Sequence, residues 1–182
     1  MMLFINRIAC RGIKGFAVVC VTVFIIFGGV SADDVFDDES KQLRILKMYG
    51  EYRKSFPEIS DISPQEVFIL LEHENVVFVD VRDSEEQAVS MIPGAITHKK
   101  FLENPDFYKG HTVIGYCTIG YRSGQLASKL MKRGIHMINL RGGILAWIHA
   151  GGEVHRDGIP VREVHVYGKT WDLAPSSYKT VY

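Results

Sequence analysis

Hydrophobic and polar residues follow a helical period in the first charged part of the chain. Residues 39–54, ESKQLRILKMYGEYRK, place Leu43, Leu46 and Tyr49 at intervals of three among charged residues. This spacing puts the three side chains on one face of a helix. We therefore expect an amphipathic helix here that buries this face and ends near Pro57.

A second helical pattern follows Ser63. Serine can cap a helix N-terminus, and proline suits the first helical position, where Pro64 stands. Farther along, Val67, Leu70 and Leu71 recur with helical spacing. The pattern predicts a helix that buries these three side chains.

Three apolar runs have the length and β-branched composition of buried strands. They occupy residues 76–80, 111–116 and 136–140. Helical patterns separate and follow them, at residues 84–90, 122–134 and 142–152. Alternation of strands and helices predicts an α/β fold with a mostly parallel central sheet, covered by helices on both faces.

The second of these three helices has a clear inward face. Leu126, Leu130 and Met131 fall on that face, and Gly134 is expected to end the helix. The connection that leads into it, residues 117–121, comes directly after a predicted strand. In a parallel sheet, ligands bind at this carboxyl end of the strands.

Charge is unevenly distributed near the N-terminus. The first 32 residues hold Arg7, Arg11 and Lys14 and no acidic residue, and the apolar run 16–30 follows these basic residues. The small residues at the end of this segment suit cleavage by signal peptidase. We therefore expect a signal peptide that is cleaved after Ala32. The run is shorter than the roughly 20 residues that span a bilayer. The protein is expected to be periplasmic or secreted in a bacterium, and an uncleaved inner-membrane anchor is the alternative.

These patterns divide the chain into four parts. They are a leader at 1–32, a helical extension at 33–58, a principal domain at 59–153 and a C-terminal extension at 154–182. The last part contains one predicted strand, at 162–167, followed by polar turn residues. The total length of 182 residues suits one domain with short extensions.

Removal of the leader would change both charge and cysteine content. The chain has 21 basic and 21 acidic residues, and loss of the three basic residues in the leader leaves 18 against 21, a net charge of −3. This balance argues against a nucleic-acid partner. Cys10 and Cys20 lie in the leader, so Cys117 becomes the single thiol of the mature chain. A lone cysteine in an oxidising compartment indicates a reactive thiol.

No metal or cofactor is expected. The seven histidines show no ligand-like spacing. The pair Gly142-Gly143 is not part of a GxGxxG phosphate-binding pattern and predicts a turn into the last helix.

Residues 117–122, CTIGYR, combine features that stabilise an anionic sulfur. The helix that follows directs its N-terminal amides and the positive end of its dipole at Cys117. A tight turn at Gly120 can group backbone N–H donors into an anion-binding nest. Arg122 adds a permanent positive charge, and Ser123 adds a hydroxyl donor. We expect a reactive thiolate on an accessible loop, and a buried packing cysteine is the alternative.

Four motifs accompany the predicted strands and this loop: VVFVDVRD at 76–83, IPGAI at 92–96, CTIGYR at 117–122 and LRGGILAW at 140–147. On these motifs, residues 59–153 resemble the single-domain rhodanese family of sulfurtransferases. The resemblance implies a rhodanese-like three-layer fold and sulfur transfer in two steps through a persulfide on Cys117. One departure is Ser90-Met91, because family members usually carry Gly-His before the IPGA-like turn.

The resemblance also implies roles in substrate binding. Backbone amides would hold the outer sulfur of the persulfide, and they belong to Thr118, Ile119, Gly120, Tyr121 and Arg122. The Arg122 side chain would orient an anionic donor. The residues themselves leave two roles open for Arg82, which either attracts the donor or forms a structural ion pair with Asp80.

The implied partners are a small sulfane-sulfur donor such as thiosulfate and a thiol or cyanide as acceptor. A protein acceptor is an alternative, and membrane contact is expected only if the leader is retained. A persulfide carrier or protein-interaction module without turnover is the second interpretation of function. A cysteine phosphatase is the third, but such enzymes place five residues between cysteine and arginine, whereas four separate Cys117 from Arg122.

Overall fold

The computed structural model describes residues 32–182, with side chains described from residue 37 onward. The predicted signal peptide lies outside these residues apart from Ala32, which is the first residue of α1. Within the described part of the chain, no helix combines the length and the apolar character needed to cross a bilayer.

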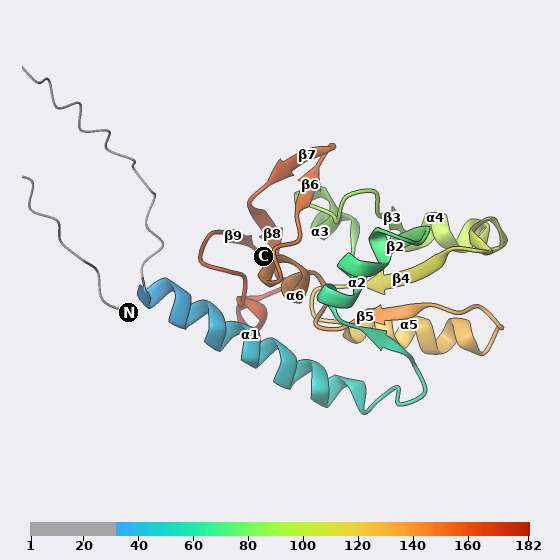
Figure 1. Ribbon diagram of the computed structural model, residues 1–182, viewed down its shortest axis with the longest axis horizontal. Coiled ribbons are helices and arrows are strands. Elements are labelled where there is room, and N and C mark those ends of the chain that lie inside the picture. Colours follow the sequence, from blue (N-terminus) through green and yellow to red (C-terminus); the bar gives the residue numbers. More distant parts are fainter. Residues whose placement is uncertain (1–31) are drawn as a thin grey trace, which may run out of the picture.

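A five-stranded sheet forms the centre of the molecule (Figure 1). Its strands are β1 (Asp61–Ile62), β2 (Val76–Asp80), β3 (Ile96–Thr97), β4 (Thr112–Tyr116) and β5 (Ile138–Leu140). Their order is β1-β5-β4-β2-β3, and every neighbouring pair is parallel. Because parallel strands need crossover connections, helices cover both faces of the sheet. The α/β fold predicted from the sequence is confirmed.

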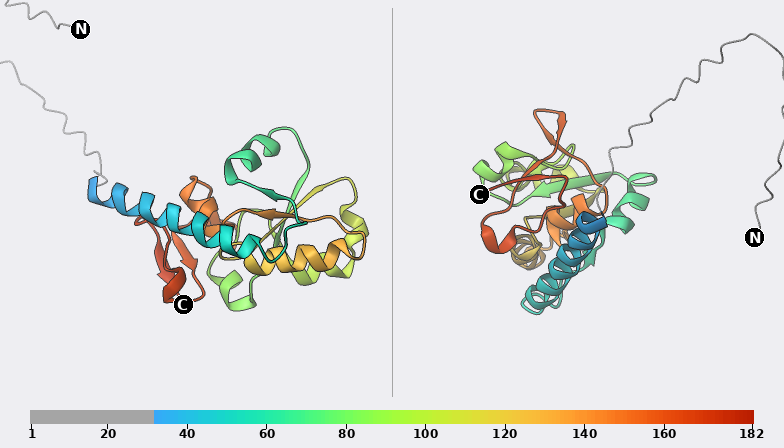
Figure 2. Two further views of the ribbon diagram at one scale, coloured as in Figure 1. Left: turned by 90° about the horizontal axis from the view of Figure 1, so that it is seen from below. Right: turned by 90° about the vertical axis from the view of Figure 1, so that its left-hand side faces the viewer.

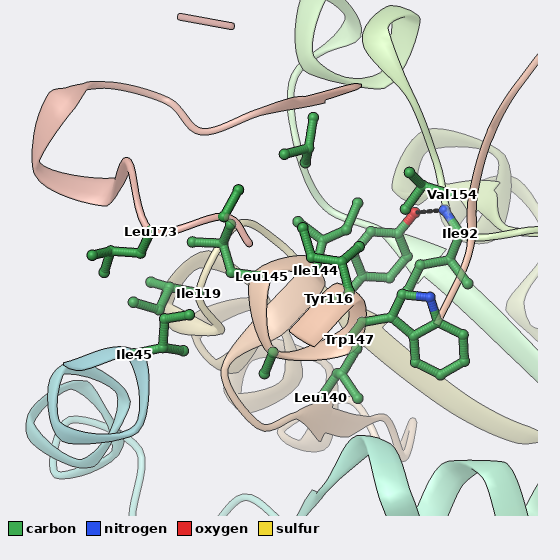
Figure 3. Close-up of a cluster of buried hydrophobic side chains, with 14 of the residues drawn as sticks. Ile45, Ile92, Tyr116, Ile119, Leu140, Ile144, Leu145, Trp147, Val154 and Leu173 are labelled. Carbon is green, nitrogen blue, oxygen red and sulfur yellow. Dashed lines mark hydrogen bonds between the residues drawn. The ribbon is translucent and has the colours of Figure 1, made fainter. Parts of the chain in front are cut away.

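Six α-helices of the described residues 32–182 surround the sheet. They are α1 (Ala32–Arg53), α2 (Pro64–Leu71), α3 (Ser84–Val89), α4 (His98–Glu103), α5 (Tyr121–Met131) and α6 (Gly143–His149). Alternation along the strands separates two apolar cores. Phe78 and Ile114 face a core shared with α2 and α6, whereas Val79 and Val113 face a core shared with α4 and α5. Figure 3 shows part of the first core.

The predicted apolar face of α1 was wrong by part of a turn. Leu43 is 62% exposed and Leu46 is 43% exposed, whereas Ile45 and Tyr49 are buried. Ile45 and Tyr49 are four residues apart, so they share one face of the helix. This face meets the main domain, because Ile45 belongs to the same core as α6. A helix with several apolar residues can present more than one face, and docking decides which of them is buried.

Two other predicted core positions lie at helix ends and were also wrong. Leu71 is 45% exposed and Met131 is 37% exposed. Each is the last residue of its helix, beside the turn to the next strand, and therefore sits at the margin of the packed face. Within the same two helices, Val67 and Leu130 are buried as predicted, and Leu70 is partly buried.

The C-terminal segment contains more structure than the one predicted strand. It forms the hairpin β6 (Val154–Arg156) and β7 (Ile159–Val161), then β8 (Glu163–His165), the 3-10 helix η2 (Lys169–Trp171) and β9 (Lys179–Val181), which pairs in parallel with β8. Figures 1 and 2 show this segment beside α1 and α6. Val164, Val166 and Leu173 enter the first core, and Ser176 donates two hydrogen bonds to the carboxylate of Asp38 in α1. Segments from both ends of the described chain therefore pack together against the same face of the sheet.

Candidate active site

Cys117 lies at the carboxyl end of a central strand. It follows Tyr116, the last residue of β4, which is paired with Asp80 at the end of β2. The chain places β3 on one side of β2 and β4 on the other, so the direction of winding changes between β2 and β4. In open parallel sheets, ligands bind in the crevice at such a switch point.

Gly120 sets the course of the loop that follows Cys117. Its φ of 99° lies in the left-handed region, and a Cβ here would stand 2.7 Å from Cε2 of Tyr49. Glycine avoids both the strain and the clash. In this conformation the Gly120 N–H donates a hydrogen bond of 3.2 Å to Sγ of Cys117. The sulfur thus faces a backbone donor at the start of α5, where the helix dipole is positive.

The opposite side of the loop is anchored to α6. The N–H groups of Ile144 and Leu145 donate to the carbonyl oxygens of Cys117 and Thr118, at 2.9 and 3.3 Å. A Cβ on Gly143 would stand 2.4 Å from the Cys117 carbonyl oxygen. The glycine pair at the start of α6, predicted to form a turn into this helix, therefore also lets the loop approach the helix.

Asn139 of β5 ties the loop to α1 and was missed in the sequence. Its side-chain NH₂ group donates to the Gly120 carbonyl at 2.8 Å and to the Tyr49 hydroxyl at 3.2 Å. Its Oδ1 accepts from Ser123 Oγ at 2.6 Å, and the Tyr49 hydroxyl donates to Asp61 at 2.9 Å. The available signal was a polar residue inside the apolar run HMINL, because a buried amide must find partners.

The thiol is not on an exposed loop. Cys117 is 2% exposed, which contradicts the expected accessibility of its side chain. The reason is that both chain extensions pack over the loop. Figure 3 shows Ile119 beside Ile45 of α1 and Leu173 of the C-terminal segment, and all three side chains belong to the first core.

Cys117 still borders a pocket of about 470 Å³. The loop contributes Thr118, Ile119, Tyr121 and Arg122 to its lining, and more distant parts of the chain contribute Tyr52, Tyr167 and Trp171. A small molecule can therefore meet the sulfur through this pocket. The last three residues were missed in the sequence analysis, because each was assigned to an extension without a role.

Arg122 is held in a bidentate ion pair with Glu86. Its two terminal nitrogens donate to the two Glu86 oxygens at 2.6 and 2.7 Å, and one of them also reaches Asp83 at 3.2 Å. Burial would lower the pKa of Arg122, but the hydrogen bonds to Glu86 and the charges of Cys117 and Glu86 raise it above its ordinary value. Burial would raise the pKa of Glu86, but Arg122 and the Asp83 backbone N–H hold it below its ordinary value. Both partners are therefore charged at neutral pH.

Glu86 was a second functional candidate that the sequence analysis missed. It is 2% exposed, and its side chain also accepts from the Asp83 N–H as part of the capping box of α3. The spacing Asp-x-x-Glu is a recognisable cap signal. Nothing in that local signal indicates the link to Arg122, which lies 36 positions farther along the chain.

Two predicted binding residues do not line the pocket. Arg82 is fully buried, pairs with Asp80 at 2.7 Å and donates to the Ser90 carbonyl. Of the two roles that the sequence left open for Arg82, the structure shows the ion pair with Asp80. Ser123 is also fully buried, and its hydroxyl is used by Asn139. The structure thus brings five members of the predicted loop to the pocket or the sulfur but leaves Arg82 and Ser123 outside.

This fold and loop match known proteins. A family model described as a rhodanese-like domain matches residues 63–150. A protein named sulfurtransferase from Allochromatium vinosum is 38% identical over 86 residues, which cover 45% of this chain and 80% of that protein. The chain belongs to the rhodanese-like family. The resemblance noted in the sequence is confirmed.

Two further likenesses are more distant. A tRNA uridine(34) hydroxylase from Buchnera aphidicola is 26% identical over 169 residues, covering 87% of this chain and 48% of that protein. The crystal structure of a thiosulfate sulfurtransferase from Pseudomonas aeruginosa is 20% identical, with a TM-score of 0.51, and covers 69% of this chain and 24% of that chain. The second likeness supports the rhodanese-like fold. The family match runs from residue 63 to residue 150, so Tyr52, Tyr167 and Trp171 lie outside it.

Proposed function

We propose that this protein is a sulfurtransferase that moves a sulfane sulfur from a small donor such as thiosulfate to a thiophilic acceptor. The observation that carries the proposal is the position of the Cys117 sulfur. It borders a pocket at the switch point of the sheet and receives the Gly120 N–H at the start of α5. Such a setting favours an anionic sulfur as nucleophile. Membership of the rhodanese-like family supports the same chemistry.

The reaction follows in two balanced steps. The Cys117 thiolate attacks the outer sulfur of thiosulfate, the bond between the two sulfur atoms of thiosulfate breaks, and sulfite leaves with the electron pair. This leaves a persulfide anion on Cys117. A thiol or cyanide then attacks the outer sulfur, and the thiolate is regenerated; with cyanide the product is thiocyanate. Because the enzyme stores the sulfur between the steps, ping-pong kinetics are expected.

Arg122 has a supporting role in this proposal. Its guanidinium edge is occupied by Glu86 and also donates to Thr118 Oγ1 at 3.2 Å. The ion pair connects α3 to the first turn of α5 and so holds the sulfur loop in shape. The guanidinium also lies close to Cys117, and Glu86 and Asp83 offset its charge there.

The carrier interpretation shares this chemistry but not its turnover. The burial of Cys117 is the observation that favours it, because a buried persulfide needs a shaped partner or a small acceptor. The hydroxylase likeness is a weaker guide, because the chain spans about half of that relative's length. The net charge of −3 after residue 32 also does not favour an RNA substrate. The four-residue spacing from Cys117 to Arg122 argues against phosphatase activity.

The first test is intact-mass spectrometry of the full chain after incubation with thiosulfate and then with cyanide. The expected result is the gain of one sulfur atom, its loss with cyanide, and no gain in Cys117→Ser. Because Cys117 is buried, far-UV circular dichroism of that variant must show an unchanged fold. An adduct that forms but is not removed by cyanide or thiols would favour the carrier. Absence of any adduct on a reduced, titratable thiol would overturn the proposed function.

We also propose that residues 1–32 direct export and are removed. The basic residues, apolar run and small residues of this segment support the proposal. The measurement is the N-terminal sequence of the protein recovered from the periplasm of an expressing bacterium. A chain that begins at Asp33 is expected. A chain that retains residues 1–32 in the membrane fraction would instead support the anchor.

A further inference from the structure

The pocket above Cys117 has walls that the rhodanese-like match does not include. Tyr52 comes from α1, and Tyr167 and Trp171 come from the segment after β8. Together with Tyr121 of α5, they give the pocket four aromatic side chains. Aromatic rings offer large apolar surfaces and preferred stacking geometries. The two extensions therefore add a surface that sulfur chemistry by itself does not require.

The volume of the pocket exceeds the needs of an inorganic donor. Thiosulfate has five non-hydrogen atoms and would fill roughly 150 Å³ if each takes about the volume of a water molecule. The pocket measures about 470 Å³, within the range of sites for small organic ligands. Space remains for an organic group beside the reacting sulfur.

The charge near the sulfur also disfavours a dianion. Arg122 is the cation among the residues that line the pocket, and it is paired with both Glu86 and Asp83. One guanidinium and two carboxylates carry a net charge of −1, next to an attacking thiolate. A donor with two negative charges meets about twice the Coulomb repulsion of a donor with one.

Tyr167 is held over this ion pair in an unusual conformation. Its φ is 66°, which few residues other than glycine adopt, and its N–H donates to His165 Nδ1 at 3.0 Å. The ring lies over the Arg122 guanidinium at 5.0 Å and meets the Trp171 ring edge-on at 5.4 Å. Strained backbone at a pocket mouth is typical of a functional position. The ring therefore covers one face of the guanidinium, while Glu86 occupies its N–H edge.

We propose that the aromatic walls bind the organic group of a monoanionic sulfane-sulfur donor, such as an organic thiosulfonate. Tyr167 and Trp171 are the residues that set this donor selectivity. The inference rests on the proposed persulfide transfer at Cys117. In the balanced step, the Cys117 thiolate attacks the outer sulfur of R–SO₂–S⁻, the sulfur–sulfur bond breaks, and the sulfinate R–SO₂⁻ leaves with the electron pair. No oxidant or reductant is needed.

The test compares three donors on the full chain, with cyanide as acceptor and thiocyanate as the product measured. The donors are thiosulfate, methanethiosulfonate and benzenethiosulfonate, and the last two differ only in the organic group. We expect kcat/KM for the benzene donor to exceed that for the methyl donor by about tenfold, the value of one good aromatic contact. Trp171→Ala should reduce this ratio to about two or less, and Trp171→Phe should restore most of it.

The ratio protects the test from effects of folding, because a partly unfolded preparation lowers both rates equally. Phe107→Ala is the matched control: Phe107 is an exposed aromatic residue outside the pocket, and its loss should leave the ratio unchanged. A ratio near one in the unmodified protein, or a ratio that Trp171→Ala does not change, would overturn the inference and leave the proposed function standing. Absence of thiocyanate with all three donors would overturn both.

Discussion

Two arginines follow neighbouring strands of the sheet, and they occupy different surroundings. Arg82 comes after β2 and is sealed between Asp80, the Ser90 carbonyl and the face of Tyr116. Arg122 comes after β4, keeps 28% of its side chain exposed, and borders the pocket at Cys117. The comparison separates a residue that holds the fold from one that shapes the site. It also shows that proximity to a strand end does not by itself place a cation in a substrate pocket.

The buried pair makes hydrogen bonds on several sides, and within the described residues Nη1 of Arg82 has no hydrogen-bond partner. Asp80 accepts hydrogen bonds from the Arg82 side chain and from the Tyr116 hydroxyl, which lies at 2.7 Å. Burial would lower the pKa of Arg82, but the charge and hydrogen bonds of Asp80 raise it. Burial and the Asp80 charge together raise the pKa of Tyr116 well above its ordinary value, so its hydroxyl remains a donor. These contacts order the ends of β2 and β4, and β4 leads directly into Cys117, which lines the pocket.

The largest expected effect is on stability, from Arg82→Met. Removing the guanidinium leaves the Asp80 carboxylate buried without its partner, which costs about 3–5 kcal/mol of unfolding free energy. Urea denaturation measures this loss. The double variant Asp80→Asn, Arg82→Met removes the uncompensated charge and should recover part of it. A folded Arg82→Met protein with unchanged stability but a raised KM for the donor would instead indicate that Arg82 acts in donor binding.

Gly120→Ala should reduce both stability and sulfur transfer. The left-handed φ and the close Tyr49 ring together cost about 2–3 kcal/mol, and any shift of the loop moves the N–H that faces Sγ. Gly134→Ala is the matched control, because Gly134 has a φ of 73° with nothing within 4 Å of the added Cβ. It should lose about 1 kcal/mol and retain transfer. Equal effects of the two variants would contradict the role of Gly120 at the site.

Arg122→Lys should affect transfer more than stability. Lysine preserves the positive charge but cannot make the bidentate contact with Glu86. We expect about a tenfold decrease in kcat/KM, the equivalent of one charged hydrogen bond. Steady-state kinetics with thiosulfate and cyanide measure it. Unchanged kinetics would show that the positive charge alone, and not the bidentate contact with Glu86, supports the loop.

Glu86→Gln should produce the smallest effect, seen as a change in pH dependence. The folded protein holds the pKa of Glu86 below the ordinary value of 4.5, so the carboxylate binds a proton less readily when folded than when unfolded. Its contribution to stability is therefore present above about pH 5 and is lost as the pH falls through the lower folded pKa. Denaturation midpoints across this range should fall less steeply for Glu86→Gln than for the unmodified protein.

Glu85→Gln is the control for that measurement, since Glu85 is an exposed residue of the same helix. It should leave the slope of stability against pH unchanged. An identical slope in all three proteins would mean that the Glu86 ion pair contributes nothing to acid stability.

Elements whose signals are local could be predicted from the amino-acid sequence. The strands β2 and β4, the helix after the cysteine, and the Cys-x₄-Arg loop all follow from a few adjacent residues, and together they identified the family. Two-residue strands such as β1 and β3 were missed, because two positions are too few to show an alternation of apolar and polar residues. The exact face of α1 was also missed, because its apolar residues permit more than one docking surface.

The enclosure of the site depends on contacts between residues that are far apart in the sequence. Asn139 bonds to Tyr49 across 90 positions, and Ser176 bonds to Asp38 across 138. Contacts of this kind cover Cys117, separate Arg82 from Arg122, and bring Tyr52, Tyr167 and Trp171 to one pocket. Their physical reason is the burial of apolar faces on the two extensions, which depends on the shape of the assembled domain and not on any local pattern.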